Sequence, residues 1–187
     1  MAGSADARSG RGGDQGRGPG MNDDLRIEAG WQPGAIGDIT ALHGRYYALH
    51  WNFGPFFEAK VASELAAFIR DRHRHPSQIW CALDAADRVV GSVVIDGSKG
   101  AETGAHLRWF IVDAKVQGLG AGARLLDAAL AFCRANGFGR VTLWTFAGLN
   151  GARHLYESRG FTLAEERPGD TWGTPVTEQR FELALGD

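Results

Sequence analysis

Gln117, Gly120 and Gly122 form a glycine-spaced turn of a kind that can hold a diphosphate group. An apolar run over residues 105–112, typical of a strand, leads into the turn, and an amphipathic helix over residues 118–136 is expected after it. Backbone N–H groups in the first turn of a helix have no acceptor within the helix and lie at the positive end of its dipole, so they favour an anion. A Cβ at position 120 or 122 would hold phosphates away from these groups. The spacing therefore predicts a phosphate cradle.

The turn differs from two familiar glycine-rich phosphate loops. A Walker loop needs Lys followed by Ser or Thr after its last glycine, and a dinucleotide fold needs Gly-x-Gly-x-x-Gly. Residues 117–122 match neither pattern, and the missing Lys and Mg²⁺ ligands argue against a nucleotide phosphate site. A plain strand-to-helix turn is the alternative for such a loop standing alone.

A second motif follows downstream, over residues 149–161. It predicts a short helix that begins at or just before Asn150, directs Leu155 and Tyr156 inward and ends at Gly160. Tyr156 taken alone would be an ordinary core aromatic. Asn150 taken alone would be a helix cap. The two motifs in this order, separated by a helix and a strand, favour a ligand site.

Together the two motifs resemble those of the GNAT family of acyl-CoA-dependent N-acyltransferases. The resemblance covers about residues 25–185 and is strongest over residues 107–161. Residues 107–113 and 172–181 are most similar to the acetyltransferase half of bacterial proteins that also carry a MarR-type winged helix. The twenty-odd residues ahead of the first expected strand are too few for a winged helix.

The resemblance implies acetyl-CoA as co-substrate and assigns roles to particular residues. Backbone groups of Phe110, Ile111 and Val112 would bond the pantetheine amides, with an N–H at or near Ile111 polarising the thioester carbonyl. Tyr156 would protonate the leaving thiolate, and Asn150 would contact pantetheine or serve only as a cap. The diphosphate would be bound by the cradle residues Gln117, Gly118, Leu119, Gly120, Ala121 and Gly122.

The acceptor amine must lose a proton before it attacks, and the candidate base is His106. Many relatives carry Glu at this position, and a histidine that titrates near neutrality is suited to the task. An exposed imidazole at a strand edge is the alternative reading. Glu102 in the preceding loop is the rival base. Arg108 shares the face of His106 by strand alternation and is a candidate for binding a substrate carboxylate.

Aromatic residues are expected to wall the acceptor pocket, although most of them also suit an ordinary core. The first two helices contribute Tyr46, Trp51 and Phe56. The last two strands contribute Trp172, with Glu178 and Arg180 as further candidates. Such a wall with a scattered carboxylate suits a small cationic or zwitterionic amine, such as an amino acid, a polyamine, an amino sugar or a xenobiotic.

The elements that must position these residues follow from hydrophobic periodicity. Strands are expected near residues 25–28, 77–84, 88–95, 105–112, 140–146, 161–167 and 176–185, and helices near 35–50, 56–71, 118–136 and 150–159. The predicted class is α/β (α+β). By the resemblance, the fold is the GNAT acyltransferase fold: a mixed, mostly antiparallel sheet of about seven strands that splays between the fourth and fifth, with about four helices.

Composition narrows the classes of partner. The 187 residues carry a net charge of −2, so no electrostatic footprint for nucleic acid or a membrane is expected. Residues 1–22 read as a disordered Gly/Arg-rich tail, and residues 23–187 as a single domain. Cys81 and Cys133 lie in apolar segments without metal-ligand spacing, which favours buried thiols in a reducing cytoplasm and no metal site.

Two function classes follow. The first is an N-acetyltransferase that moves an acetyl group from acetyl-CoA to a primary amine of a small molecule or peptide, by direct attack in a ternary complex. The alternative is a catalytically silent acyl-CoA-binding regulatory module, which Tyr156 disfavours and His106 in place of Glu slightly favours. Many relatives pair as homodimers, an expectation that the sequence does not test.

Overall fold

The computed structural model describes residues 25–100 and 104–186, so the predicted tail and Glu102 lie outside the described residues. Within these ranges every expected element is present, with ends that differ by a few residues. The strands are β1 (Arg26–Ala29), β2 (Gln78–Leu83), β3 (Val89–Asp96), β4 (Ala105–Val112), β5 (Arg140–Phe146), β6 (Thr162–Gly169) and β7 (Val176–Ala184). The helices are α1 (Ala35–Trp51), α2 (Pro55–Asp71), α4 (Ala121–Ala135) and α5 (Asn150–Glu157).

The seven described strands form one sheet in the order β1-β2-β3-β4-β5-β7-β6. All neighbouring pairs are antiparallel except β4 and β5, which run parallel. The mixed, mostly antiparallel sheet with four helices in the described part of the chain confirms the predicted fold class.

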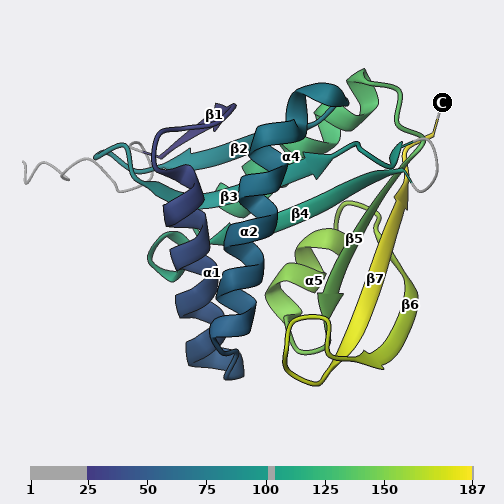
Figure 1. Cartoon of the computed structure of the whole chain (residues 1–187). Coiled ribbons are helices and arrows are strands. Elements are labelled where there is room, and N and C mark those ends of the chain that lie inside the picture. Colours follow the sequence, from purple (N-terminus) through teal and green to yellow (C-terminus); the bar gives the residue numbers. More distant parts are fainter. Residues whose placement is uncertain (1–24, 101–103, 187) are drawn as a thin grey trace, which may run out of the picture.

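The sheet splays between β4 and β5. Pairing joins Ala105 to Val141, His106 to Thr142 and Leu107 to Leu143, and stops there. Beyond Leu107 the two strands diverge from their common end (Figure 1). The backbone edges that face each other across the gap are therefore available to a ligand.

Helices cover both faces of the sheet. α1 and α2 pack on one face and α4 on the other (Figure 1). Ile39, Phe57 and Leu65 lie in the core beneath α1 and α2, whereas Leu125 and Leu130 of α4 lie in the second core. α5 joins this second core through Tyr156. A ligand in the gap between β4 and β5 would thus be in reach of both layers.

A β-bulge at Trp109 interrupts the alternation of β4. Ser92 of β3 pairs with Ile111, but Val94 pairs with Arg108, so Trp109 and Phe110 together oppose a single residue. Trp109 has a φ of 43°, and its carbonyl accepts a hydrogen bond of 2.7 Å from the Ser92 hydroxyl. Because of the extra residue, Arg108 and Trp109 both face α1 and α2.

Candidate functional site

The glycine turn leaves its outer side open. Gly118 and Gly120 have φ values of 83° and 78°, and a Cβ at either position would meet no atom within 4 Å. Left-handed backbone favours glycine here, and the open space lies where an anion would approach. Gly120 is the N-cap of α4, so this helix begins at Ala121 and not at the expected residue 118.

Most amides of the cradle have no internal acceptor. The first hydrogen bond of α4 runs from the Arg124 N–H to the Gly120 carbonyl, at 3.0 Å. Among the described residues, no acceptor binds the N–H groups of Gly118, Gly120, Ala121, Gly122 and Ala123. Unpaired amides converging at a helix N-terminus form an anion site. The sequence prediction did not include Ala123, although it lies in the first turn.

Two predicted cradle residues, Gln117 and Leu119, have amides that are already hydrogen-bonded within the turn. The amides of Gln117 and Leu119 form long turn bonds of 3.4 Å to the carbonyls of Ala114 and Val116. Leu119 does not line the adjoining cavity, whereas Gln117 does. Leu119 is therefore the weakest of the predicted phosphate contacts, because its amide is already used in the turn.

The register of β4 decides which of its amides face the gap. The Asp113 N–H donates to the Val90 carbonyl of β3 at 2.8 Å, so by ladder alternation the Ile111 amide also faces β3. The amides of Val112 and Phe110 then face β5. The peptide between Trp109 and Phe110 has the same orientation. The Trp109 carbonyl points toward Ser92 of β3, so the Phe110 N–H on the same planar peptide must point away from β3. This register is compatible with the expected ligand bonds at Phe110 and Val112, but the bond expected at Ile111 is wrong, because its amide is directed toward β3.

One cavity of about 1080 Å³ connects the cradle, the gap between β4 and β5, and the face covered by α1 and α2. Predicted site residues make up much of its lining: Tyr46, His106, Arg108, Phe110, Ile111, Val112, Gln117, Gly118, Gly120, Ala121, Gly122, Asn150, Tyr156 and Trp172. The residues of both sequence motifs thus meet at one site.

Tyr156 is buried against aromatic rings and lines this cavity. Its side chain is 5% exposed, and its ring centroid lies 5.9 Å from that of Phe110 and 5.8 Å from that of Phe161. Burial raises the pKa of the phenol far above its usual value, so the hydroxyl keeps its proton. No group among the described residues forms a hydrogen bond with this hydroxyl, although Tyr156 lines the cavity.

Asn150 is not a helix cap. The N-cap of α5 is Leu149, and no side chain forms a capping hydrogen bond there. Asn150 is the first residue of α5 and lines the cavity. The capping role considered for this side chain is therefore wrong, which leaves its amide free for another partner.

His106 lines the cavity, but it does not titrate near neutrality. Burial, and after it the positive charge of Arg108, lower the pKa of its imidazole to about 4. Asp96 and Glu64 oppose this shift only in part. The imidazole is therefore neutral at physiological pH and holds a proton weakly, contrary to the expectation from its ordinary pKa.

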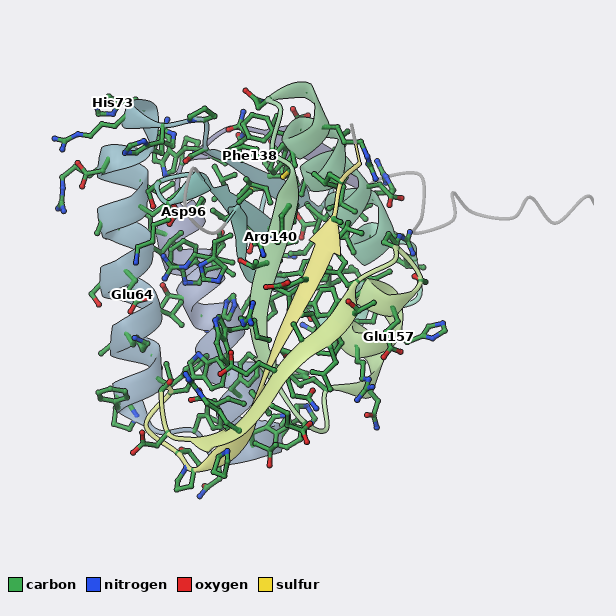
Figure 2. The ribbon with its side chains drawn as sticks, turned by 90° about the vertical axis from the view of Figure 1, so that its right-hand side faces the viewer. Glu64, His73, Asp96, Phe138, Arg140 and Glu157 are labelled. Atoms are coloured by element: carbon green, nitrogen blue, oxygen red, sulfur yellow. The ribbon has the colours of Figure 1, made fainter. Side chains whose placement is uncertain are left out.

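Arg108 is held between two carboxylates. Its guanidinium donates to Glu64 of α2 at 2.5 Å and to Asp96 of β3 at 3.3 Å, and lies 4.0 Å from the Trp109 ring centroid. Figure 2 labels both carboxylates, with Glu64 on α2 and Asp96 above and to the right of it. Lys60 also donates to Glu64, at 2.5 Å. Arg108 therefore has few donors left for a substrate.

Sequence reasoning missed Glu64 and Lys60, which both line the cavity. Their four-residue spacing is that of an exposed helical ion pair, the usual reading for such a pattern. The one available signal was the position of α2, which the resemblance already placed at the acceptor pocket.

The aromatic wall differs in part from the expectation. Tyr46, Tyr47, Phe57, Phe146 and Trp172 line the cavity, but Trp51 and Phe56 do not. Trp51 packs on Phe146, with ring centroids 4.8 Å apart, and fills the space beside Gly148. Phe56 is 60% exposed and lies against Gly173 in the β6–β7 loop. Both therefore support the wall from outside it.

Glu178 of β7 anchors the β6–β7 loop. It is 2% exposed, and it accepts a hydrogen bond of 2.9 Å from the Thr171 N–H and one of 3.5 Å from the Arg167 guanidinium. Burial alone would raise the pKa of this carboxyl, but the bonds from Thr171 and Arg167 outweigh it and hold the pKa below its usual value. Thr171, Trp172, Glu178 and Arg167 all line the cavity, whereas Arg180 does not.

A family model described as the acetyltransferase (GNAT) family matches residues 44–161, which span both motifs and the strand between them. The chain belongs to the GNAT family. This GNAT protein is an N-acyltransferase with an acyl-CoA co-substrate. The open cradle with its unpaired amides fits the diphosphate of that co-substrate. No curated protein matches the sequence significantly.

Solved GNAT structures share the fold at low sequence identity. A GNAT acetyltransferase from Staphylococcus aureus Mu50 is 15% identical, with a TM-score of 0.70 over 86% of this chain and 99% of its own. YncA from Salmonella typhimurium, solved with acetyl-CoA, is 17% identical, with a TM-score of 0.70 over 88% and 95%. Spermidine N-acetyltransferase from Vibrio cholerae, solved with CoA and spermine, is 20% identical, with a TM-score of 0.65 over 87% and 96%.

Outside the cavity, further features of this GNAT protein bear on thiol reactivity, metal binding and membrane crossing. Burial raises the pKa of both Cys81 and Cys133 to about 12, so both are inert thiols. In residues 25–100 and 104–186, no three His, Cys, Asp or Glu side chains are arranged to hold a metal ion. None of the helices described there combines the length and the apolar character needed to cross a membrane.

Proposed function

We propose that the enzyme transfers an acetyl group from acetyl-CoA to a primary amine of a small molecule, by direct attack in a ternary complex. One observation carries this proposal. A single cavity joins the unpaired amides of the cradle, the splayed strands with Tyr156 between them, and an acceptor end walled by α1, α2 and the β6–β7 loop. A donor and an acceptor can therefore be held at the same time.

The backbone would bind and polarise the donor. Amides of Gly118, Gly120, Ala121 and Gly122 hold the diphosphate, and the gap-facing groups of β4 align the pantetheine arm. The N–H of Phe110, with Val112 beside it, donates to the carbonyl oxygen as negative charge develops there. Acetyl-CoA supplies the thioester acyl group.

Tyr156 would give its proton to the departing sulfur. Its raised pKa keeps the hydroxyl protonated throughout the working range of pH, and its open hydroxyl has no competing partner. Direct attack is supported because Cys81 and Cys133 are buried with a pKa of about 12, so neither is an activated nucleophile.

His106 would align the amine without storing its proton. An imidazole with a pKa of about 4 is far too weak a base to hold the proton of an alkyl ammonium ion. As a neutral hydrogen-bond acceptor it can still orient an N–H of the attacking amine. The amine would lose its ammonium proton to solvent before it binds, and the proton that its nitrogen releases after the attack would restore the phenol of Tyr156.

The deciding experiment measures thiol release from acetyl-CoA with a panel of amines. The panel contains amino acids, polyamines, amino sugars and arylamines, and acetylated products are identified by mass spectrometry. Amine-dependent thiol release with an N-acetylated product is expected. A protein that binds acetyl-CoA but releases no thiol above background with any amine would instead be the silent regulatory module.

The context of the enzyme is part of the proposal. Buried free thiols and a net charge of −2 support a cytoplasmic protein without a nucleic-acid or membrane partner. Pairing as a homodimer is tested by light scattering on the purified protein. The likeness of residues 107–113 and 172–181 to MarR-type fusion proteins stays a prediction from sequence.

A further inference from the structure

Arg167 of β6 places a guanidinium at the acceptor end of the cavity. It lies over the ring of Trp144 of β5, 4.7 Å from the centroid. Its ion pairs are long, at 3.2 Å to Glu165 and 3.5 Å to Glu178, and its side chain is 53% exposed. Arg167 is therefore oriented by its neighbours while it remains accessible from the cavity.

The buried carboxylate of Glu178 fixes the position of Arg167. Glu178 is 2% exposed and also accepts the Thr171 N–H, so it holds Arg167 and the β6–β7 loop together. A Cβ at Gly169 would overlap the Glu178 carboxyl group, so glycine leaves the room for it. The loop in turn carries Trp172, whose ring centroid lies 5.6 Å from that of Phe146.

Among the described charged residues of the cavity lining, cations outnumber carboxylates, while Asp96 and Glu165 pair with Arg108 and Arg167 from outside the lining. Lys60, Arg108 and Arg167 line the cavity, against Glu64 and Glu178. Each of these two carboxylates already binds a cation: Glu64 binds Lys60 and Arg108, and Glu178 binds Arg167. A polycation would find no unpaired carboxylate among them, whereas a substrate carboxylate can add to an exposed guanidinium.

We propose that the acceptor is a zwitterionic aromatic amine, of the class of the aromatic α-amino acids, whose carboxylate binds Arg167 and whose ring packs against the aromatic lining that includes Trp144 and Trp172. Arg167 is the anchor because its side chain is 53% exposed and its ion pairs are 3.2 and 3.5 Å long, whereas Arg108 is 24% exposed and, like Lys60, is bound to Glu64 at 2.5 Å. A planar guanidinium suits a carboxylate, and the tryptophan rings suit an aromatic side chain. This inference rests on the proposed N-acetyltransferase function.

The test compares matched amines in the thiol-release assay. Phenylalanine carries the carboxylate, phenylalaninamide replaces it with an amide, phenethylamine lacks it, and spermidine is a polycation. Phenylalanine is expected to have the highest kcat/KM, at least about 10-fold above each of the others, the scale of a charged hydrogen bond. An equal or higher kcat/KM for phenethylamine or spermidine would overturn the proposal.

Two variants locate the anchor. Arg167→Gln should raise the KM for phenylalanine about 10- to 100-fold with little change in kcat, and should leave phenethylamine unaffected. Arg180→Gln is the matched control, since Arg180 also binds Glu165 but lies outside the cavity lining. An equal loss for all amines in Arg167→Gln would contradict the assignment. If Arg167→Gln fails to fold by circular dichroism, Arg167→Lys keeps the charge without the forked donors and should show an intermediate rise in KM.

A binding measurement separates this inference from the proposed function. Equilibrium dialysis of phenylalanine and phenethylamine against the CoA-saturated protein needs no turnover. Tighter binding of phenylalanine, lost in Arg167→Gln, supports the subsite even if no amine releases thiol. Equal binding of the two amines refutes the subsite even if acetyl transfer is observed.

Discussion

Tyr156 combines burial with an unpaired hydroxyl, which is the arrangement that an acid for a leaving thiolate requires. Tyr156→Phe removes one oxygen and keeps the ring packing against Phe110 and Phe161. We expect kcat to fall about 10²- to 10⁴-fold, the usual range for a lost general acid, with the Kd for acetyl-CoA changed less than about threefold. Steady-state kinetics and a fluorescence titration with acetyl-CoA measure the two quantities. An unchanged kcat would remove Tyr156 from this role.

The low pKa of His106 predicts how kcat/KM depends on pH. At a pKa of about 4, His106 stays neutral from pH 5 to 9 and contributes no rising limb in that range. The rise of kcat/KM with pH should then follow the pKa of the acceptor amine, and its midpoint should move between amines of different basicity. His106→Gln should keep that midpoint while lowering kcat/KM by about 10-fold or less, for one lost hydrogen bond. A limb near pH 6.5 that vanishes in His106→Gln would restore histidine as the base.

At the scale of elements, the N-terminus of α4 acts through its main chain, so only an added side chain can block it. Gly120→Glu would place a carboxylate in the open space where the diphosphate is bound. We expect the Kd for acetyl-CoA, measured by calorimetry, to rise more than about 100-fold through charge repulsion and steric exclusion. Gly137→Glu is the control for backbone strain, because Gly137 also has a positive φ (70°) and open space but ends the same helix far from the cradle. Similar Kd values for the two variants would contradict the cradle.

β4 shows how far elements follow from sequence. Its bounds were predicted correctly because apolar residues alternate with His106 and Arg108 and then run without interruption from Trp109 to Val112. The bulge at Trp109 was not predicted, since it depends on the Ser92 hydroxyl of a neighbouring strand. A single extra residue decides that Phe110 and Val112, and not Ile111, face the gap. Local periodicity thus determines the strand, while pairing with β3 determines which of its amides are free.

At the scale of the whole molecule, buried histidines couple stability to pH. Burial lowers the pKa of His43 to about 4, against an ordinary value of 6.5, so between these values the unfolded chain binds the proton first. This contribution is present above pH 6.5 and is lost as the pH falls toward 4. It amounts to about 3 kcal/mol at most, at 1.36 kcal/mol per pKa unit.

His43→Asn tests this coupling by urea unfolding at several pH values. The variant should be less stable than the wild type at pH 8, because it loses packing, but its free energy of unfolding should fall less between pH 6.5 and 4.5. The free energy of unfolding should still depend on pH to some extent, since the pKa of His106 is also lowered. An equally steep fall in the variant would show that other groups dominate acid unfolding.

The donor half of the site was largely predictable, whereas the acceptor half was predictable only in part, because Lys60, Glu64 and Arg167 were not foreseen. The donor groups lie in two short motifs, around Gly120 and Tyr156, whose spacing is read along the chain. The acceptor groups come from separate elements: Glu64 from α2, Arg167 from β6 and Glu178 from β7. Their meeting depends on tertiary packing, and so does the displacement of Trp51 and Phe56 from the cavity lining.

The early end of pairing between β4 and β5 has a consequence for the free protein. Phe110 and Val112 then carry main-chain N–H groups without a strand partner, while Ile111 between them is bonded to β3. Deuterium from solvent should therefore enter the protein in an alternating pattern, quickly at 110 and 112 and slowly at 111. Saturation with acetyl-CoA should slow the first two positions and leave the third unchanged, because the bound pantetheine arm stands in for the absent neighbouring strand.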